Sequence, residues 1–187
     1  MSGRMAIGPM FVLLALMARQ AQAVSTYICT TFQEGSGLYG VYPTGINNQG
    51  QIAGSFESFS PGGFFVDSNG MDLPLSLPPF IAGGTYTIIS VNNLGQVAGY
   101  GLDNTVSPRR YRGFVANPDG TYSVIDPPAS TPTQNFSDLY LFNVNDNGEL
   151  SGVVPIRDES GVTTGYSFLR DAAGFFTLFD PSPHNPT

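Results

Sequence analysis

The sequence predicts an all-β fold, organised as a propeller-like repeat array of three four-stranded antiparallel blades that forms an open or incomplete propeller. One nine-residue pattern occurs three times, as INNQGQIAG at residues 46–54, VNNLGQVAG at 91–99 and VNDNGELSG at 144–152. Charged residues make up only 11% of the chain, which also contains 23 glycines and 15 prolines. This composition is typical of short strands joined by tight turns, and the repetition indicates units that bury their apolar faces against one another.

The N-terminal segment, residues 1–23, is predicted to be a secretory signal peptide. A short apolar run at residues 10–18 is followed by the small-x-small sequence AQA, which ends at Ala23. The run is shorter than the roughly 20 residues that cross a bilayer, so we expect no membrane insertion once the signal is removed. We expect a mature chain that starts at Val24, forms a single β-repeat domain over residues 24–187, and is secreted, extracellular or periplasmic.

The mature chain is strongly acidic. It keeps five arginines and no lysine against 14 acidic residues, which gives a formal charge of −9. This charge disfavours nucleic acid and anionic membranes as partners. Cys29 is the single cysteine, so no internal disulfide and no cysteine-based zinc site can form. We interpret Cys29 as a buried thiol, with pairing between two molecules as the alternative.

Each unit contains two turns with the pattern Asx-x-x-Gly. The Asx side chain accepts local backbone hydrogen bonds, and the glycine adopts a left-handed backbone without steric cost. We therefore expect six hairpin turns, all at the same end of the strands. The residues that define them are Asn47 and Gly50, Asp67 and Gly70, Asn92 and Gly95, Asn117 and Gly120, Asn145 and Gly148, and Asp171 and Gly174.

The strands are expected on both sides of these turns, in units that span approximately residues 41–75, 87–126 and 139–180. Strand one ends at residues 46, 91 and 144, strand two covers 51–56, 96–100 and 149–154, strand three includes 64–66, 114–116 and 168–170, and strand four covers 71–75, 121–126 and 175–180. Pro74 indicates that the fourth strand lies at a sheet edge. Residues 26–32 are predicted to form an extra N-terminal strand, which would raise the number of strands from twelve to thirteen.

The repeated pattern, together with the phenylalanine that follows it, resembles the HAF repeat of extracellular bacterial proteins. That repeat reads roughly G-I-N-x-x-G-x-I-V-G and, after a spacer, H-A-F-L; the resemblance covers about residues 44–179. At the H-A-F positions this chain has GGF at 62–64, RGF at 112–114 and YSF at 166–168, so only the phenylalanine is retained. The resemblance implies a secreted β-repeat protein and carries no catalytic motif.

Long and unlike loops are expected at the end of the units opposite the tight turns, where binding sites on rigid repeats are usually found. Arg109, Arg110, Tyr111 and Arg112 form the basic cluster of this end and could hold a carboxylate, sulfate or phosphate group. The alternative interpretation is a solvated loop that neutralises nearby acids, which is the commoner use of such a run.

The sequence therefore favours a non-catalytic binding or surface-interaction module that contacts a glycan or protein partner through the long loops and needs no cofactor. Self-association through exposed sheet edges is a further expectation. The alternative is a small extracellular hydrolase, in which Asp158 and Glu159 act as general acid and base with Asp103 or Asp138.

No metal site is predicted. The asparagines that precede Gly148 mimic the start of a calcium loop, but Val154 stands where such a loop needs a glutamate. We therefore interpret this segment as a turn. His184 is the single histidine and lies near the C-terminus, so a Ser-His-Asp grouping is not expected.

Overall fold

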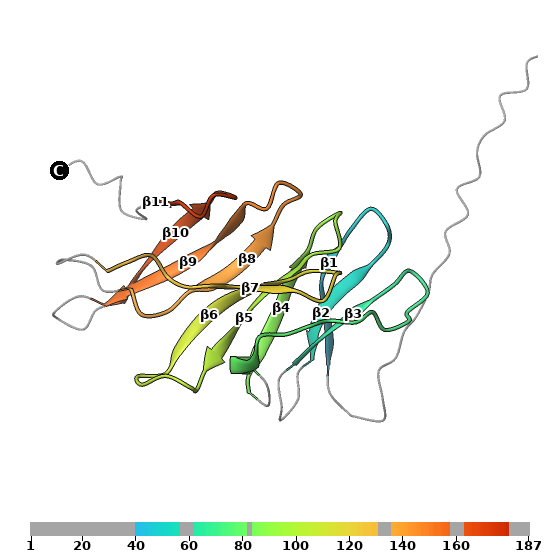
Figure 1. The fold of residues 1–187 in the computed structure, drawn as a ribbon, viewed down its shortest axis with the longest axis horizontal. Coiled ribbons are helices and arrows are strands. Elements are labelled where there is room, and N and C mark those ends of the chain that lie inside the picture. The colour runs from blue at the N-terminus through green and yellow to red at the C-terminus, as the bar shows by residue number, and fades with distance from the viewer. Residues whose placement is uncertain (1–39, 57–61, 82–83, 131–135, 158–162, 180–187) are drawn as a thin grey trace, which may run out of the picture.

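The computed structural model describes residues 40–56, 62–81, 84–130, 136–157 and 163–179, which form three antiparallel sheets in chain order (Figure 1). The prediction of an all-β fold is confirmed. The first sheet contains β1 (Val41–Ile46), β2 (Ile52–Phe56) and β3 (Gly62–Val66). The second contains β4 (Tyr86–Val91), β5 (Val97–Asp103), β6 (Arg110–Ala116) and β7 (Tyr122–Ile125), and is preceded by the 3-10 helix η1 (Pro79–Ile81). The third contains β8 (Tyr140–Val144), β9 (Leu150–Arg157), β10 (Thr163–Arg170) and β11 (Phe176–Phe179).

Consecutive strands pair with each other in all three sheets, and the first strand of each sheet ends where it was predicted to end, at Ile46, Val91 and Val144. The second strands of the later sheets extend further than predicted, to Asp103 and Arg157. Both extensions lead toward the long loops, so these two sheets reach further at the loop end than the repeated pattern indicates.

The predicted fourth strand of the first unit is wrong. Residues 71–75 contribute only an isolated bridge between Val66 and Asp72. Leu73 still donates its N–H to the carbonyl of Phe65 at 2.8 Å, but Pro74 follows and has no N–H with which to continue the ladder. The first sheet therefore has three strands where the other two have four. The predicted N-terminal strand at residues 26–32, with its Cys29, lies outside the described residues.

All six predicted turns are confirmed. In each, the N–H of the glycine donates to the carbonyl of the Asx residue at 3.0 or 3.1 Å, and the glycine has a positive φ between 74° and 98°. The Asx side chain also accepts backbone N–H bonds at Asn47, Asp67, Asn92, Asn145 and Asp171. The sixth residue, Asn117, instead donates to the hydroxyl of Thr121. The backbone bond and the left-handed glycine that the sequence predicts are thus formed at all six turns, and the predicted Asx side-chain bonds are formed at five of them.

The two turns of each unit lie side by side. A Cβ atom built on Gly50 would lie 3.0 Å from that of Ser68, one on Gly95 would lie 3.1 Å from Pro118 Cγ, and one on Gly148 would lie 3.9 Å from Ala172 Cβ. The six turns therefore occupy one end of the strands, here called the turn end. The remaining connections run between the opposite strand ends, here called the loop end.

The last glycine of the repeated pattern makes room for the retained phenylalanine. The two residues are cross-strand neighbours in every sheet, and strand one has a register shift close to this point. A Cβ atom on the glycine would collide with the phenylalanine ring and with a strand-one carbonyl oxygen. The three sets are Gly54 with Phe64 and Tyr42 O, Gly99 with Phe114 and Thr87 O, and Gly152 with Phe168 and Tyr140 O.

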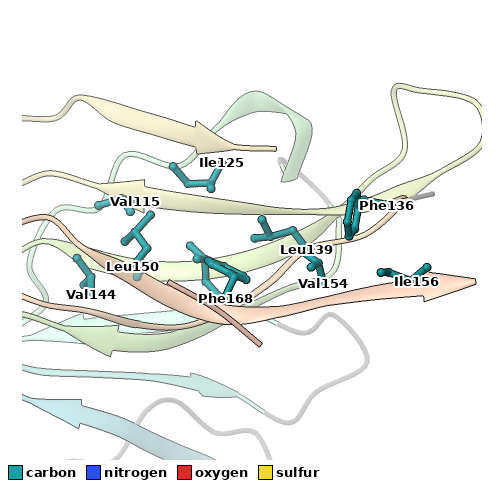
Figure 2. Packing of buried hydrophobic residues seen from close by; sticks show 11 residues of the cluster. Val115, Ile125, Phe136, Leu139, Val144, Leu150, Val154, Ile156 and Phe168 are labelled. Atoms are coloured by element: carbon teal, nitrogen blue, oxygen red, sulfur yellow. The ribbon is translucent and has the colours of Figure 1, made fainter. Parts of the chain in front are cut away.

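The sheets pack face to face in chain order. Strand β4 packs against all three strands of the first sheet, and β8 packs against β4, β5 and β6 of the second. One apolar cluster joins Ala53 and Phe65 of the first sheet to Ile88, Val91 and Val97 of the second. A second cluster joins the second and third sheets, and Figure 2 shows its members, among them Val115, Ile125, Val144, Leu150 and Phe168. Each junction therefore buries apolar side chains from two facing sheets.

A ladder of hydrogen bonds links the first turns of the three units. The Asn47 side chain donates through Nδ2 to the carbonyl of Asn92 at 2.9 Å, and Asn92 donates in the same way to Asn145, also at 2.9 Å. Beside it, the N–H of Asn48 donates to Oδ1 of Asn93, whose own N–H donates to Oδ1 of Asp146. The first two positions of each first turn thus link every pair of neighbouring sheets at the turn end.

Candidate functional site

The basic cluster predicted from the sequence lies at the loop end of the second sheet. Strand β6 begins at Arg110, so alternation along the strand places Arg110 and Arg112 on one face and Tyr111 on the other. Arg109 precedes the strand and is exposed. The four residues are therefore divided between two environments rather than forming one cationic surface.

Arg112 is held by two carboxylates. Its Nε and Nη2 atoms donate to both oxygens of Asp126 at 2.7 and 2.8 Å, and Nη1 donates to Asp103 at 2.9 Å. The guanidinium carbon lies 5.2 Å from the ring centroid of Phe80. Arg110 also approaches Asp126, at 3.4 Å. Of the two interpretations of the sequence, neutralisation of nearby acids describes Arg110 and Arg112.

Asp103 is fully buried. Burial by itself would raise the pKa of this carboxyl, but hydrogen bonds from the Thr105 hydroxyl, the Thr105 N–H and Arg112 outweigh it and hold the pKa below 3.8. Burial likewise opposes the charge on Arg112, while Asp126 and Asp103 raise the pKa of the guanidinium above its ordinary value. The pair therefore stays charged, and Asp103 is unsuited to donate a proton as a general acid.

Tyr111 faces the junction with the third sheet and belongs to a cluster of three tyrosines. Its ring lies 6.1 Å from that of Tyr100 on β5 and 5.0 Å from that of Tyr140 on β8, and the rings of Tyr100 and Tyr140 are 5.1 Å apart. All three side chains are half-buried. We call these three residues the tyrosine cluster.

Asp138 lies beside the tyrosine cluster and fixes the chain that leads into β8. Its Oδ1 accepts the N–H of Tyr111 at 2.7 Å, and the N–H of Leu139 donates to the carbonyl of Tyr111 at 2.9 Å. Burial raises the pKa of Tyr140 to about 12, and the neighbouring Asp138, Tyr111 and Tyr100 add to this effect. The Tyr140 phenol is therefore neutral and able to donate a hydrogen bond throughout the physiological range.

Sequence reasoning found Tyr111 but missed Tyr100 and Tyr140. The sequence does contain a signal for Tyr100. Gly99 and Phe114 are on one face of the sheet, so Tyr100, the next residue along the strand, must point to the other face. Tyr140 joins the cluster only through the packing of β8 on the second sheet. No pattern within a single unit contains that information.

The remaining site predictions fall into two groups. Asp158, Glu159 and His184 lie outside the described residues. Asp103 and Asp138 are described but have separate partners, since one binds Arg112 and the other binds the Tyr111 N–H.

The calcium-like segment is a hydrogen-bonded turn. Oδ1 of Asn143 accepts the hydroxyl of Ser90, and Oδ1 of Asn145 accepts the N–H groups of Asn147 and Glu149. Within the described part of the chain, no three side chains of His, Cys, Asp or Glu come together in a way that could hold a metal ion.

Two hollows open on the first sheet. One, of about 270 Å³, lies between this sheet and the segment that follows it, and its lining includes Phe56, Leu73 and Tyr86. The other, of about 380 Å³, is lined by Pro43, Thr44, Gly45, Ile46 and Ile52. This second hollow lies on the side of the sheet that faces away from the second sheet.

The fold and this site define a class of protein: an all-β array of stacked antiparallel sheets that carries an aromatic cluster at its loop end. Comparison with family models, curated proteins and solved structures found no match. In the described ranges, no helix has the length and apolar character needed to cross a membrane.

Proposed function

We propose that the protein is a secreted, non-catalytic binding module of the HAF-repeat type, whose stacked sheets form a propeller-like array and whose loop end binds a glycan. The observation that carries the proposal is the tyrosine cluster, in which three half-buried aromatic rings meet at the junction of two sheets. Aromatic rings with a polar group at one end can pack against a sugar ring and hydrogen-bond to its hydroxyl groups. Asp138 adds a carboxylate beside them.

The difference between the two ends of the array supports this placement. At the turn end, the N–H of each turn glycine donates to the backbone carbonyl of the Asx residue in every unit, and the ladder joins the units. The loop end has connections of unequal length on a rigid support, which is the usual position of a binding surface. Arg109 is the exposed arginine of the basic cluster and would contribute to recognition of an anionic sugar.

A glycan array followed by titration of the sugars that bind would test the proposal. Replacement of Tyr140 by Leu is expected to weaken binding about tenfold, equivalent to about 1.4 kcal/mol, because the ring contact is lost. The matched control is Tyr122→Leu, since Tyr122 is an exposed tyrosine of the second sheet that lies next to a tight turn. An equal loss of affinity in the two variants, or an affinity that is unchanged in Tyr140→Leu, would show that the ligand binds elsewhere.

A further inference from the structure

The two outer faces of the array carry apolar residues at positions that are buried inside it. The front face is the side of the first sheet that points away from the second, and it carries Pro43, Ile46 and Ile52. The rear face is the side of the third sheet that points away from the second, and it carries Leu169 and Phe179. Both assignments follow from alternation along the strands and from the cross-strand pairs.

Ile46 occupies the same place in its unit as Val91 and Val144. Those two valines are 7% and 3% exposed because the preceding sheet covers them, whereas Ile46 is 68% exposed. Ile52 corresponds in the same way to Val97 and Leu150, which are both buried. The hollow of about 380 Å³ lies between these front-face side chains, where a preceding sheet would pack.

The rear face shows the complementary pattern. Leu169 and Phe179 correspond to Val115 and Ile125 of the second sheet, which are buried against the third sheet (Figure 2). Leu169 itself is 40% exposed and Phe179 is 52% exposed. The rear face thus has large apolar side chains at the positions that an additional sheet would cover.

The hydrogen-bond ladder is also incomplete in a matching way. The Nδ2 atoms of all three asparagines donate to the residue four positions on in their own turn, Gln51, Gln96 or Glu149. Asn47 and Asn92 also donate through Nδ2 to the next unit, whereas Asn145 has no following unit within the described residues. At the other end of the ladder, the Asn47 carbonyl accepts the N–H of Gly50. The Asn92 and Asn145 carbonyls accept the equivalent glycine N–H and, in addition, a side-chain donor from the preceding unit. The Asn145 side chain at the rear end could therefore donate one more hydrogen bond of this kind, and the Asn47 carbonyl at the front end could accept one.

We propose that a second copy of this chain covers these faces, with the rear face of one copy packed head to tail on the front face of the other. Leu169 would enter the hollow beside Ile46, in the same way that the equivalent residues Val115 and Val144 share one apolar cluster within the chain. Asn145 of one copy would donate to the Asn47 carbonyl of the other. Two three-sheet chains joined in this way at both ends close a ring of six sheets, which lies within the range of four to eight blades found in propellers.

Measurement of molar mass by sedimentation and light scattering tests the proposal. The purified protein is expected to have twice the mass of one chain, and Ile46→Lys or Leu169→Glu should each raise the dimer dissociation constant at least tenfold. Mixing the two variants should restore dimers, because each mixed dimer keeps one native junction and places Lys opposite Glu in the other. Leu94→Lys is the control, since Leu94 is an exposed apolar residue of a tight turn away from both faces, and it should leave the dimer intact.

Several results would overturn the proposal. One is a protein that stays monomeric at all concentrations, and another is a dimer that survives both single substitutions. A third is a pair of variants that fail to associate when mixed, which would indicate a symmetric contact instead. If the wild type is a monomer and Ile46→Lys lowers its unfolding temperature, the chain itself covers the front face, and the second copy is excluded.

Discussion

At the scale of single residues, the repeated glycine and phenylalanine show how the pattern in the sequence produces the sheet. Gly99 lies opposite Phe114 in the register, and the ring occupies the space that a side chain at position 99 would fill. The neighbouring carbonyl of Thr87 closes the same space from strand one. The motif therefore encodes a steric arrangement between three strands.

Substitution of this glycine tests the arrangement. Gly99→Ala is expected to destabilise the protein by about 1–3 kcal/mol, because the added methyl group forces Phe114 or the backbone to move in a packed core. Chemical denaturation would measure the change in the free energy of unfolding. Gly84→Ala is the control, since the nearest atom to a Cβ there is 3.6 Å away. An unchanged stability in Gly99→Ala would show that the space is not filled as described.

Tyr140 provides a second test at this scale. Its pKa in the folded protein is about 12, above the ordinary 10.0, so the unfolded chain loses the proton first as the pH rises. The stability contributed by the neutral phenol is therefore complete below about pH 10 and is lost between about pH 10 and 12. The ultraviolet difference spectrum between the wild type and Tyr140→Phe should show one tyrosine that ionises late in this window. Ionisation of that tyrosine near its ordinary pKa would contradict the buried position.

At the scale of elements, polar contacts add to apolar packing both between neighbouring sheets and between the strands of one sheet. Asn92 is 5% exposed and connects its own turn to the turn of the next unit. Arg112 connects β6 to Asp103 at the end of β5 and to Asp126, which follows β7. These side chains act at opposite ends of the same sheet.

For the ladder, Asn92→Ala should cost about 1–3 kcal/mol more than Asn145→Ala. Both substitutions remove the side-chain oxygen that accepts two N–H groups of the turn. Of the two, Asn92 alone also makes a partly buried bond to another unit, because Asn145 ends the ladder within the described residues. Denaturation midpoints of the two variants give the comparison, and equal midpoints would show that the inter-unit bond contributes nothing.

For the ion pairs, Arg112→Gln should destabilise the fold by about 3 kcal/mol, because Asp103 would be left buried without its cation. Arg110→Gln, at a half-exposed position, should cost less than about 1 kcal/mol. The pKa of Asp103 is lowered, so its contribution to stability is present above pH 3.8 and is lost as the pH falls through the folded value. Thermal unfolding across this acid range should therefore show a weaker dependence on pH in Arg112→Gln if the pair acts as described.

At the scale of the whole molecule, the predictable features were those that depend on local chemistry. Gly50 and its five equivalents require a left-handed backbone, so the sequence identified every tight turn and the strand ends beside it. The fourth strand of the first unit was predicted wrongly, because Pro74 is compatible with both an edge strand and the absence of a strand. The tyrosine cluster depends on a contact between two sheets, which residue patterns within one unit do not record. The pairing of Arg112 depends on how the ends of β5, β6 and β7 meet within one sheet, which the repeated pattern does not include.

Export of the protein remains a prediction at this scale. Mass spectrometry of the secreted form should find a chain that starts at Val24, because a positively charged start, an apolar run and a small-x-small site occur in the expected order. The control is a variant with Ala21 and Ala23 replaced by Leu, which should retain the uncleaved mass. An intact chain that begins at Met1 in the wild-type cytosol would contradict the prediction.

The ladder has a consequence for how this chain can change. Asn47 reaches Asn92 across 45 residues, and Asn92 reaches Asn145 across 53 residues, yet both bonds measure 2.9 Å. The pitch of the array is therefore set at the turn end, independently of how much polypeptide separates two units. Added residues can be accommodated at the loop end without moving the sheets. Because the spacing of the sheets is set at the turn end, new recognition sequences can arise by insertion at the loop end. The loop end is for the same reason a suitable place to display grafted peptides.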